Sequence, residues 1–480
     1  MYLIILIGLV LRLSFINKPE GLWNDEYVSW MVSSTPFGEG FWQEVLKQCH
    51  MPFYYLYIKL FSGYSDLVLR LTSVVPSVIS IYVMYLVGKE YSKKAGILAC
   101  SVTSVLSFLI YYSQEVRFYS LLFLFSSLSL LFTIRVIKNA SKQNYLGLIV
   151  SNFLILFTHV LGIIYVVFDV MYVVWKKRVF SKKFIPLVIF VFLFTGFFGL
   201  VIIKQLPASQ WWGHFSYTNI LFLFSDFFSP ILTNNVNAPS VFFYNARLAL
   251  WMTVPVIIGF LGMIFGFRQN KGIFAVSLCT IVITSVLAIS GKIVFISKYL
   301  TEILPIFIIM MVCGFCRMKK YGLILFALFI AFHIASVFTP NYVTKLPRNE
   351  GHRIVGEILN SRKADNIVFT YYAPDRFYRY FKKRGNLYHI SKVNRYEYKD
   401  NPERILDKIK AGETVSVVLL DSVSFFPEEY LNLYKDKLPE MFVIFSHIRN
   451  VLIEELNNNY SDFIVDRKGY WTVITAKKKK

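Results

Sequence analysis

Charged residues are scarce in this sequence. They make up 17% of its 480 residues, whereas an ordinary soluble domain carries about a quarter. In their place the chain has 56% hydrophobic and 18% aromatic residues, and aromatic side chains concentrate where a membrane meets water. The composition excludes a typical soluble enzyme and predicts an integral membrane protein.

Cysteine is also rare, and familiar nucleotide-binding motifs are missing. Five cysteines, an odd number, do not make a disulfide framework. Cys313 and Cys316 form a CxxC without a second pair or a histidine cluster, so we interpret both as small apolar helix residues. The sequence after Pro340 has neither a GxGxxG motif nor a P-loop. The sequence therefore gives no support to redox, zinc or nucleotide chemistry.

The formal net charge of +22 raises the question of a nucleic-acid partner. The basic residues fall mostly between apolar runs, where they act as topology signals with anionic lipid as the counter-charge. We therefore expect membrane lipids, and no nucleic acid, among the partners.

Long apolar runs predict about eleven transmembrane helices, since roughly 20 apolar residues span the hydrocarbon. The first run, Met1–Phe15, has no basic region before it and no small-residue cleavage site after it, so we expect a retained helix and not a signal peptide. The further runs are 67–88, 96–113, 117–137, 145–158, 160–175, 184–204, 246–267, 273–290, 298–316 and 321–338.

Basic residues occupy alternate loops and predict the orientation of these helices. If the count of eleven holds, all five basic loops lie on one side, which should be cytoplasmic. They contain Lys89, Lys93 and Lys94; Lys138 and Lys142; Lys176, Lys177, Arg178, Lys182 and Lys183; Arg268 and Lys271; and Arg317, Lys319 and Lys320. The opposite, extracytoplasmic side then holds the loops 17–66 and 205–245 and everything after Pro340.

The chain changes character after Pro340, where charges become frequent and apolar runs shrink to strand length. Strands alternating with helices predict a small soluble α/β domain with a mainly parallel sheet. We expect a membrane domain over 1–340 and an extracytoplasmic domain over 341–480. The expected strands are Asp365–Tyr372, Thr414–Leu420, Met441–His447 and Tyr470–Ala476, and the expected helices are Arg348–Arg362, Asn401–Ala411 and Pro427–Leu438.

Ionisable residues gather at or near the membrane on the predicted outer side, although each costs about 2.5–3.5 kcal/mol at membrane depth. Asp25 and Glu26 follow the first apolar run between Trp23 and Trp30. Such a pair suits proton abstraction or cation binding. It equally suits the first turn of a helix, where acidic residues stabilise the helix dipole.

A second group of outer residues surrounds a short turn. Glu115 and Arg117 lie between two apolar runs in a stretch rich in tyrosine, including Tyr119. An arginine there suits a phosphate through its planar donor fork, although it could also reach lipid headgroups or pair with the glutamate. Further candidates are His50 with Tyr54 and Tyr55, His159, and Lys298 with Tyr299.

These motifs, in this order, resemble the GT-C superfamily of membrane glycosyltransferases. The chain is similar to relatives of dolichyl-phosphate-mannose protein mannosyltransferases and of the lipid A aminoarabinose transferase, over roughly residues 1–310. Many relatives have a proline where this chain has Met51 and an arginine where it has Lys298. The matching residues are Asp25-Glu26, His50-x-Pro52 with Tyr54-Tyr55, Gln114-Glu115-x-Arg117-x-Tyr119, Thr158-His159, and Lys298-Tyr299-Leu300 with Pro305.

The resemblance implies a sugar donor linked to polyprenyl phosphate and a protein, lipid or glycan acceptor. It implies a single inverting displacement with Asp25 as general base and Glu26 orienting the acceptor or a cation. Arg117, helped by His159 and Lys298, would stabilise the leaving phosphate. A divalent ion at Asp25, Glu26 and His50 stays open, and no other cofactor is expected.

Two other classes of function compete with this interpretation. A lipid or sugar transporter or flippase would place ionisable groups near the bilayer midplane and show internal repeats, neither of which is evident here. An assembly protein with a partner-binding outer domain would leave the Asp25 pair and the Glu115–Arg117 turn without a role.

Overall fold

The chain forms two compact units in a computed structural model. A helical unit comprises Met1–Ile16 and Val28–Leu346, and a C-terminal unit comprises Asn17–Tyr27 and Pro347–Lys480. The structure describes residues 1–19, 21–48, 51–177, 215, 217–230, 246–291, 293, 295–339, 342, 345, 351–369, 379–381, 386–389, 392–394, 397–398, 406–420, 440–468 and 471–480.

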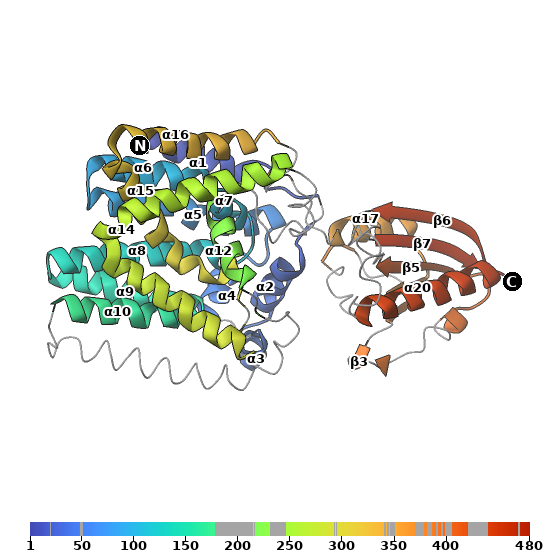
Figure 1. The fold of residues 1–480 in the computed structure, drawn as a ribbon. Helices are drawn as coiled ribbons and strands as arrows, with labels where there is room; N and C mark the ends of the chain where they lie inside the picture. The colour runs from blue at the N-terminus through green and yellow to red at the C-terminus, as the bar shows by residue number, and fades with distance from the viewer. Residues whose placement is uncertain are drawn as a thin grey trace. The chain divides into compact units, whose positions relative to one another are not determined.

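Helices make up the first unit (Figure 1). Serine side chains cap three of them, because the hydroxyls of Ser65, Ser92 and Ser141 accept bonds from the first turns of α5, α6 and α9. The helices are α1 (Tyr2–Leu13), α2 (Asn24–Ser34), α3 (Glu39–Lys47), α4 (Pro52–Lys59), α5 (Asp66–Lys89), α6 (Lys93–Val105), α7 (Ser107–Ser113), α8 (Tyr119–Lys138), α9 (Lys142–Thr158), α10 (Gly162–Lys177), α12 (Thr218–Phe228), α14 (Ala246–Ile289), the 3-10 helix η3 (Ser297–Ile303), α15 (Leu304–Arg317) and α16 (Lys319–Ser336).

The membrane character expected from the sequence is confirmed. Within the described residues, five helices are long and apolar enough to cross a bilayer, or six if the bent pair α6–α7 counts as one span. The expected run 96–113 is this pair, and it bends by 55° at Leu106. The expected helix 184–204 lies outside the described residues, so the count of eleven stays a prediction.

One boundary expected inside the membrane region is absent from the structure. The runs 246–267 and 273–290 were expected as two helices, but both belong to α14, which is helical through 44 residues. A straight helix of that length would reach about 66 Å, roughly twice the hydrocarbon thickness. Figure 1 shows that α14 instead changes direction along its course. The basic residues at 268 and 271 lie within α14 and do not end it.

The described basic loops gather at one end of the helical unit, which we call the basic end. Glu90, just after α5, accepts bonds from Arg135 at 2.8 Å and from Lys138 at 3.2 Å, both near the end of α8. Arg268 and Arg317 line one cavity between α14 and α15. Helices α8 and α15 therefore begin at the opposite end, which we call the site end, and finish at the basic end.

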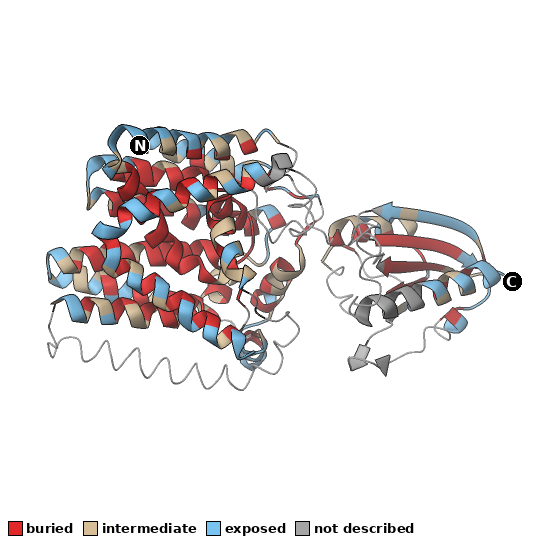
Figure 2. Ribbon diagram, in the orientation of Figure 1, coloured by how far each residue is buried: buried red, intermediate tan, exposed pale blue. Residues whose placement is uncertain are grey.

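Polar side chains in the interior of the helical unit join neighbouring helices. Arg12 of α1 is fully buried and donates to the Ser77 hydroxyl of α5 at 2.7 Å and to the Thr103 carbonyl of α6 at 2.9 Å. Figure 2 shows how continuous this buried interior is along the helices. Buried hydrogen-bond donors with partners on two helices fix how those helices pack.

The C-terminal unit is a mixed sheet with helices, as the expected α/β class requires. Its strand order is β2-β1-β5-β7-β6, with β1 parallel to β2 and β5, and β7 antiparallel to β5 and β6. Half of the pairings are thus parallel, fewer than expected. The elements are α17 (His352–Arg362), β1 (Asn366–Phe369), β2 (Asn386–His389), β3 (Lys392–Asn394), β4 (Glu397–Tyr398), η5 (Leu406–Lys408), β5 (Thr414–Leu420), α20 (Glu440–Asn459), β6 (Tyr460–Lys468) and β7 (Trp471–Lys478).

Three of the four expected strands are present, and one is wrong. The segment Met441–His447 belongs to α20 and not to a strand. Leu452 and Leu456, one helical turn apart, are buried in the core beside β5, so tertiary packing favours a helix here. Of the expected helix Asn401–Ala411, only the single turn η5 is present among the described residues. The expected helix Pro427–Leu438 lies outside them.

Candidate active site

The turn between α7 and α8 holds two expected site residues, Glu115 and Arg117. The Arg117 amide donates a hydrogen bond to the Glu115 carbonyl at 2.8 Å. The Ser73 hydroxyl of α5 donates to the same carbonyl at 2.5 Å and lies 3.3 Å from the Arg117 carbonyl. Gln114 donates to the Arg12 carbonyl at 2.8 Å. The backbone under Arg117 is therefore held by both α5 and α1.

The Arg117 guanidinium lies inside the protein. Its side chain is 4% exposed, and one terminal nitrogen donates to the Ser29 hydroxyl of α2 at 3.2 Å. A snorkelling arginine keeps its head group in water, so that interpretation of Arg117 does not fit. The guanidinium carbon lies 5.4 Å from the ring of Phe118 and 6.0 Å from that of Tyr119, close enough for cation–π attraction.

Aromatic rings from three segments meet beside Arg117, and we call them the aromatic cluster. Phe118 and Tyr119 start α8, His159 follows α9, and Tyr299 belongs to η3. The His159 ring stacks on Phe118 at 4.7 Å and lies 5.5 Å from Tyr299. Tyr119 and Tyr299 are 6.5 Å apart. Tyr119 and Tyr299, two expected site residues that are 180 positions apart in the chain, are thus adjacent.

Lys298 places a second cation on the aromatic cluster. Its ammonium lies 5.8 Å from the Tyr119 ring and 5.6 Å from the Tyr299 ring. Tyr119 therefore carries cation–π contacts from both Arg117 and Lys298. Two cations held near one ring, in a partly desolvated position, favour an anionic ligand between or beside them.

His159 is the neutral member of the cluster. It is 2% exposed, and its Nδ1 has no hydrogen-bond partner among the described residues. Burial, together with the nearby charge of Arg117, lowers the pKa of His159 to about 3. The ring is therefore uncharged near neutral pH. Of the three basic residues expected at this site, two carry charge and the third contributes a stacking surface.

Tyr54 packs edge-on against Phe118, with Tyr55 beside it. They lie on α4, which starts at Pro52, a residue well suited to the first helical position. Both are buried, and the Tyr54 ring lies 6.2 Å from Phe118 and 6.1 Å from Tyr55. The structure thus places Tyr54 beside the aromatic cluster and Tyr55 beside Tyr54. His50 lies outside the described residues.

Asp25 and Glu26 occupy the first turn of α2. Glu26 is fully buried, and its Oε2 accepts a bond from the Trp23 amide at 3.1 Å. This is the return half of a capping box, in which an acidic side chain at the third helical position satisfies the amide before the helix. Glu26 therefore has a structural role in starting the helix. Asp25 is half-buried and is the more accessible of the two carboxylates.

The described residues contain no group of three His, Cys, Asp or Glu side chains that could hold a metal ion. The expected metal set of Asp25, Glu26 and His50 includes one residue outside that part of the chain. Glu26 is already engaged with the Trp23 amide, which weakens its case as a ligand.

Sequence inspection missed two buried acidic residues within apolar runs. Glu302 of η3 lies one turn after Lys298, is fully buried, and has no hydrogen-bond partner for either oxygen among the described residues. Asp169 of α10 is buried and accepts bonds from Ser129 at 3.1 Å and Thr133 at 2.8 Å. An acidic residue inside an apolar run is itself the signal that would have found both.

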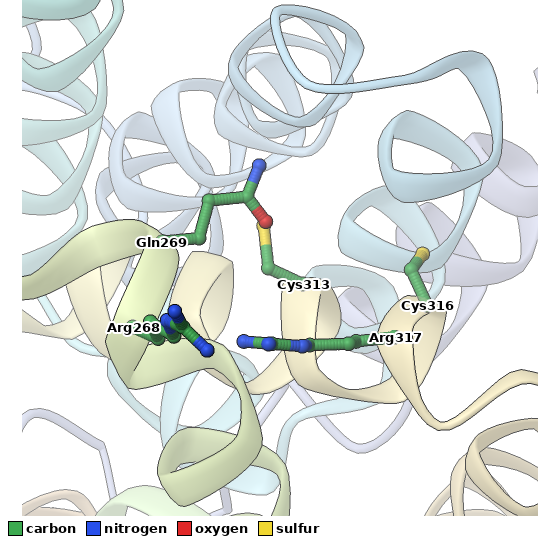
Figure 3. A pocket seen from close by; sticks show the side chains of 5 residues that line it. All are labelled: Arg268, Gln269, Cys313, Cys316 and Arg317. Carbon is green, nitrogen blue, oxygen red and sulfur yellow. The ribbon is translucent and has the colours of Figure 1, made fainter.

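A cavity of about 500 Å³ lies away from this site, between α14 and α15 at the basic end. Figure 3 shows Arg268 and Arg317 extending toward each other across it, with Cys313 facing Gln269. The cavity shares no residue with the aromatic cluster. It is therefore separate from the chemistry expected of this protein.

The fold and the site together define a membrane-embedded helical protein with a buried cationic and aromatic site at one end of its helices. Residues 51–202 match the family model described as dolichyl-phosphate-mannose-protein mannosyltransferase. This range contains Arg117, Tyr119 and His159, and it covers less than half of the chain. No curated protein matches the chain in a sequence comparison.

Solved structures share the fold over nearly the whole chain. ArnT from Cupriavidus metallidurans in the apo state has a TM-score of 0.57 at 11% identity, covering 99% of this chain and 97% of ArnT. The same protein bound to undecaprenyl phosphate has a TM-score of 0.52 at 12% identity, with the same coverage. The resemblance to GT-C membrane glycosyltransferases expected from the motifs is confirmed, and at this identity the structural likeness concerns the fold.

Proposed function

We propose that this protein is a membrane glycosyltransferase that moves a sugar from a polyprenyl-phosphate donor to an acceptor. One observation carries the proposal: Arg117 and Lys298 both lie against Tyr119 within a buried aromatic cluster. Two cations near aromatic surfaces suit a lipid phosphate followed by a sugar ring. The family match over 51–202 and the fold shared with an undecaprenyl-phosphate-bound protein support this choice.

The proposed reaction is a single inverting displacement. Asp25 takes the proton from an acceptor hydroxyl or amine as that atom attacks the anomeric carbon. The bond from that carbon to the phosphate oxygen breaks, and its electron pair stays on the lipid phosphate. Arg117 and Lys298 stabilise the charge that develops there, the kind of preorganised electrostatics that usually contributes most to catalysis.

The neighbouring residues bind and orient the reactants in this scheme. Glu26 holds the first turn of α2, which carries Asp25. Glu115 shapes the Arg117 turn through its carbonyl. Tyr54, Tyr55, Tyr119, His159 and Tyr299 supply the apolar and stacking surfaces.

The donor and acceptor surroundings follow from the same proposal. The donor lipid lies among membrane lipids, and the acceptor is a protein, lipid or glycan on the extracytoplasmic face. The domain over 341–480 belongs to that face. The gathering of basic loops at the other end of the helical unit supports this orientation, since basic loops favour the cytoplasm.

One observation favours the alternative of a transporter or flippase. Asp169 is an ionisable group in the middle of α10, at the depth where transporters bind their substrates. Its carboxylate is engaged by Ser129, Thr133 and Asn152, which come from α8 and α9. A carboxylate so fully bonded suits a fixed link between three helices better than a carrier site.

The proposal is tested by replacing Asp25 with Asn and assaying transfer with dolichyl-phosphate mannose as the donor probe in detergent. Loss of a general base costs about 100- to 10,000-fold, so release of dolichyl phosphate should nearly stop. Asp407→Asn, an exposed aspartate of the C-terminal unit, is the matched control and should retain the wild-type rate. Activity of Asp25→Asn near wild type would remove Asp25 as the base.

A further inference from the structure

The segment before α2 packs into the C-terminal unit. Residues Asn17–Tyr27 form one compact body with Pro347–Lys480, although more than 300 positions separate them in the sequence. This segment leads directly into the first turn of α2, which carries Asp25. The contacts that hold it therefore bear on the proposed general base.

Leu22 is held through both of its backbone polar groups. Its amide donates to the Tyr380 hydroxyl at 2.7 Å, and its carbonyl lies 3.1 Å from Nδ1 of His352 on α17. A carbonyl only accepts, so this bond requires the His352 proton on Nδ1. Leu22 and His352 are both fully buried, which excludes water as a substitute partner. Two bonds to one buried residue fix its position and its orientation.

Tyr380 and His352 are in turn anchored to the rest of the unit. The Tyr380 carbonyl accepts from the Asn360 side chain of α17 at 3.0 Å. The His352 ring lies 6.2 Å from Trp471, a buried residue of β7. The two residues that bond Leu22 are therefore themselves held by α17 and by the sheet.

Gly21 allows the close approach that these bonds need. Its φ is +84°, a backbone conformation that favours glycine. A Cβ there would lie 2.7 Å from the Tyr380 hydroxyl oxygen and 3.0 Å from Cβ of Arg353. Any side chain at position 21 would push the segment away from Tyr380.

We infer that the C-terminal unit positions Asp25, with Tyr380 and His352 as positioning residues that act through Leu22. Leu22 is three residues before Asp25, and the intervening Trp23 amide is tied to Glu26 of the same helix turn. The path from Tyr380 to the first turn of α2 is short and bonded at each step. The inference rests on the proposed role of Asp25, and it gives the C-terminal unit a part in catalysis beyond any binding of acceptor.

The direct test is hydrogen exchange of the full-length protein in detergent, measured on peptides covering residues 18–27. Tyr380→Phe removes the hydroxyl that accepts from Leu22 and keeps the ring. The bond is of the kind that shifts a local equilibrium by about 2- to 10-fold, so exchange in this segment should accelerate by that factor. Tyr460→Phe is the matched control, because the Tyr460 hydroxyl bonds the Leu406 carbonyl at 3.2 Å in the same unit. It should leave residues 18–27 unchanged.

Transfer from dolichyl-phosphate mannose supplies the second measurement. Small misplacements of a reacting group can cost up to about 100-fold, so Tyr380→Phe should lower kcat severalfold and leave KM for the donor unchanged. Unchanged exchange in 18–27, or faster exchange with an unchanged kcat in a protein that Asp25→Asn inactivates, would overturn the inference. Full activity of Asp25→Asn would instead defeat the proposed function.

A pair of glycine variants provides an independent check. Gly21 and Gly412 have nearly the same φ, +84° and +83°. A Cβ at Gly412 would meet no atom within 4 Å, whereas a Cβ at Gly21 would meet Tyr380. Gly21→Ala and Gly412→Ala therefore impose the same backbone strain on the same unit. Only Gly21→Ala should accelerate exchange in 18–27 and lower kcat. Equal effects of the two variants would show that strain, and not the hold on Leu22, is responsible.

Discussion

The two ends of the helical unit both carry arginine and lysine, but the charged groups differ in their exposure to solvent. At the site end, Arg117 is 4% exposed and lies among aromatic rings on a turn held by α5 and α1. At the basic end, Arg268 and Arg317 are exposed and line an open cavity. Burying a charge costs free energy that only a partner or a ligand returns. Arg12 shows that a buried arginine can be wholly structural, so the cations and aromatic rings around Arg117 distinguish the site end, and not burial alone.

Replacing Arg117 should lower the transfer rate more than replacing any other basic residue at either end of the helical unit. Arg117→Ala should lower the transfer rate by about 100- to 1,000-fold, as expected for the loss of one donor that stabilises developing charge. Arg117→Lys should recover part of the rate, because lysine keeps the charge and loses the planar fork. The assay is dolichyl phosphate release, with thermal unfolding measured in parallel. A loss of folding that accounts for the whole effect would contradict a catalytic role.

Asp169, in the middle of the helices, should respond in the opposite way. Asp169→Ala leaves the Thr133 hydroxyl and the Asn152 side-chain amide without the carboxylate that accepts their bonds. Because single interhelical bonds in membranes contribute about 0.6 kcal/mol on average, the loss of this network should cost roughly 2 kcal/mol of stability. Folded protein should keep its transfer rate. A rate that falls with unchanged stability would favour the transporter-like role of an intramembrane acid.

Lys298 should give an intermediate effect on transfer. Lys298→Ala removes one of two cations on Tyr119 and should slow transfer by about 10-fold, a loss of about 1.4 kcal/mol. Lys298→Arg should match or exceed the wild-type rate, since arginine adds bidentate geometry at the same position. Rates for the two variants that do not differ would mean that Lys298 makes no contact with the phosphate.

His159 offers a test based on pH. Its pKa is lowered to about 3 in the folded protein, against about 6.5 when unfolded. The unfolded chain then binds the extra proton first, so the stability that neutral His159 contributes is complete above pH 6.5 and declines as the pH falls toward 3. His159→Phe keeps the stacking surface and should flatten this decline in thermal unfolding between pH 7 and 4. Identical pH profiles for both proteins would contradict a buried neutral ring.

The smallest effect should come from the basic end. Arg268→Ala and Arg317→Ala, alone or together, should change stability by no more than about 0.5 kcal/mol, as for other exposed positions. Transfer rates should be unaffected. A rate loss comparable to that of Lys298→Ala would mean that the cavity in Figure 3 takes part in the reaction.

Much of the helical unit could be predicted, because the length of an apolar run and the basic residues of the loop after it are both visible in the local sequence. The α8 and α15 spans and the gathering of basic loops follow from those two signals. The continuity of α14 through Arg268 could not be predicted from these signals, because helix ends depend on capping and packing as well as on hydropathy. Glu302 and Asp169 were overlooked because the apolar residues around them dominate the local pattern.

The C-terminal unit shows where local patterns mislead. Thr414–Leu420 is a strand, as its β-branched residues predict, and it lies in the middle of the sheet. Met441–His447 has a similarly apolar composition, and short apolar runs do not separate strands from helices. The polar residues that follow, with Leu452 and Leu456 one turn apart, reveal the helix. The edge strand β6 was not predicted, because its apolar run Phe463–Val465 is only three residues long and is flanked by charged residues.

Candidate site residues could be selected from the sequence, but their arrangement could not. Motif order selected Arg117, His159 and Lys298, and the structure brings all three to the aromatic cluster. His159 is uncharged because it is buried, and Glu26 caps α2 because of the local backbone geometry. Neither burial nor backbone geometry can be read from the spacing of residues in the sequence.

The most direct test of this account is binding of undecaprenyl phosphate to the purified protein, compared between wild type, Arg117→Ala and Arg317→Ala. The two variants remove the same charge from opposite ends of the helical unit. We expect Arg117→Ala to weaken binding by about 10-fold or more, as for the loss of a charge-assisted bond, and Arg317→Ala to bind as the wild type does. Equal affinities for all three proteins, or a loss confined to Arg317→Ala, would contradict a lipid-phosphate site at the aromatic cluster.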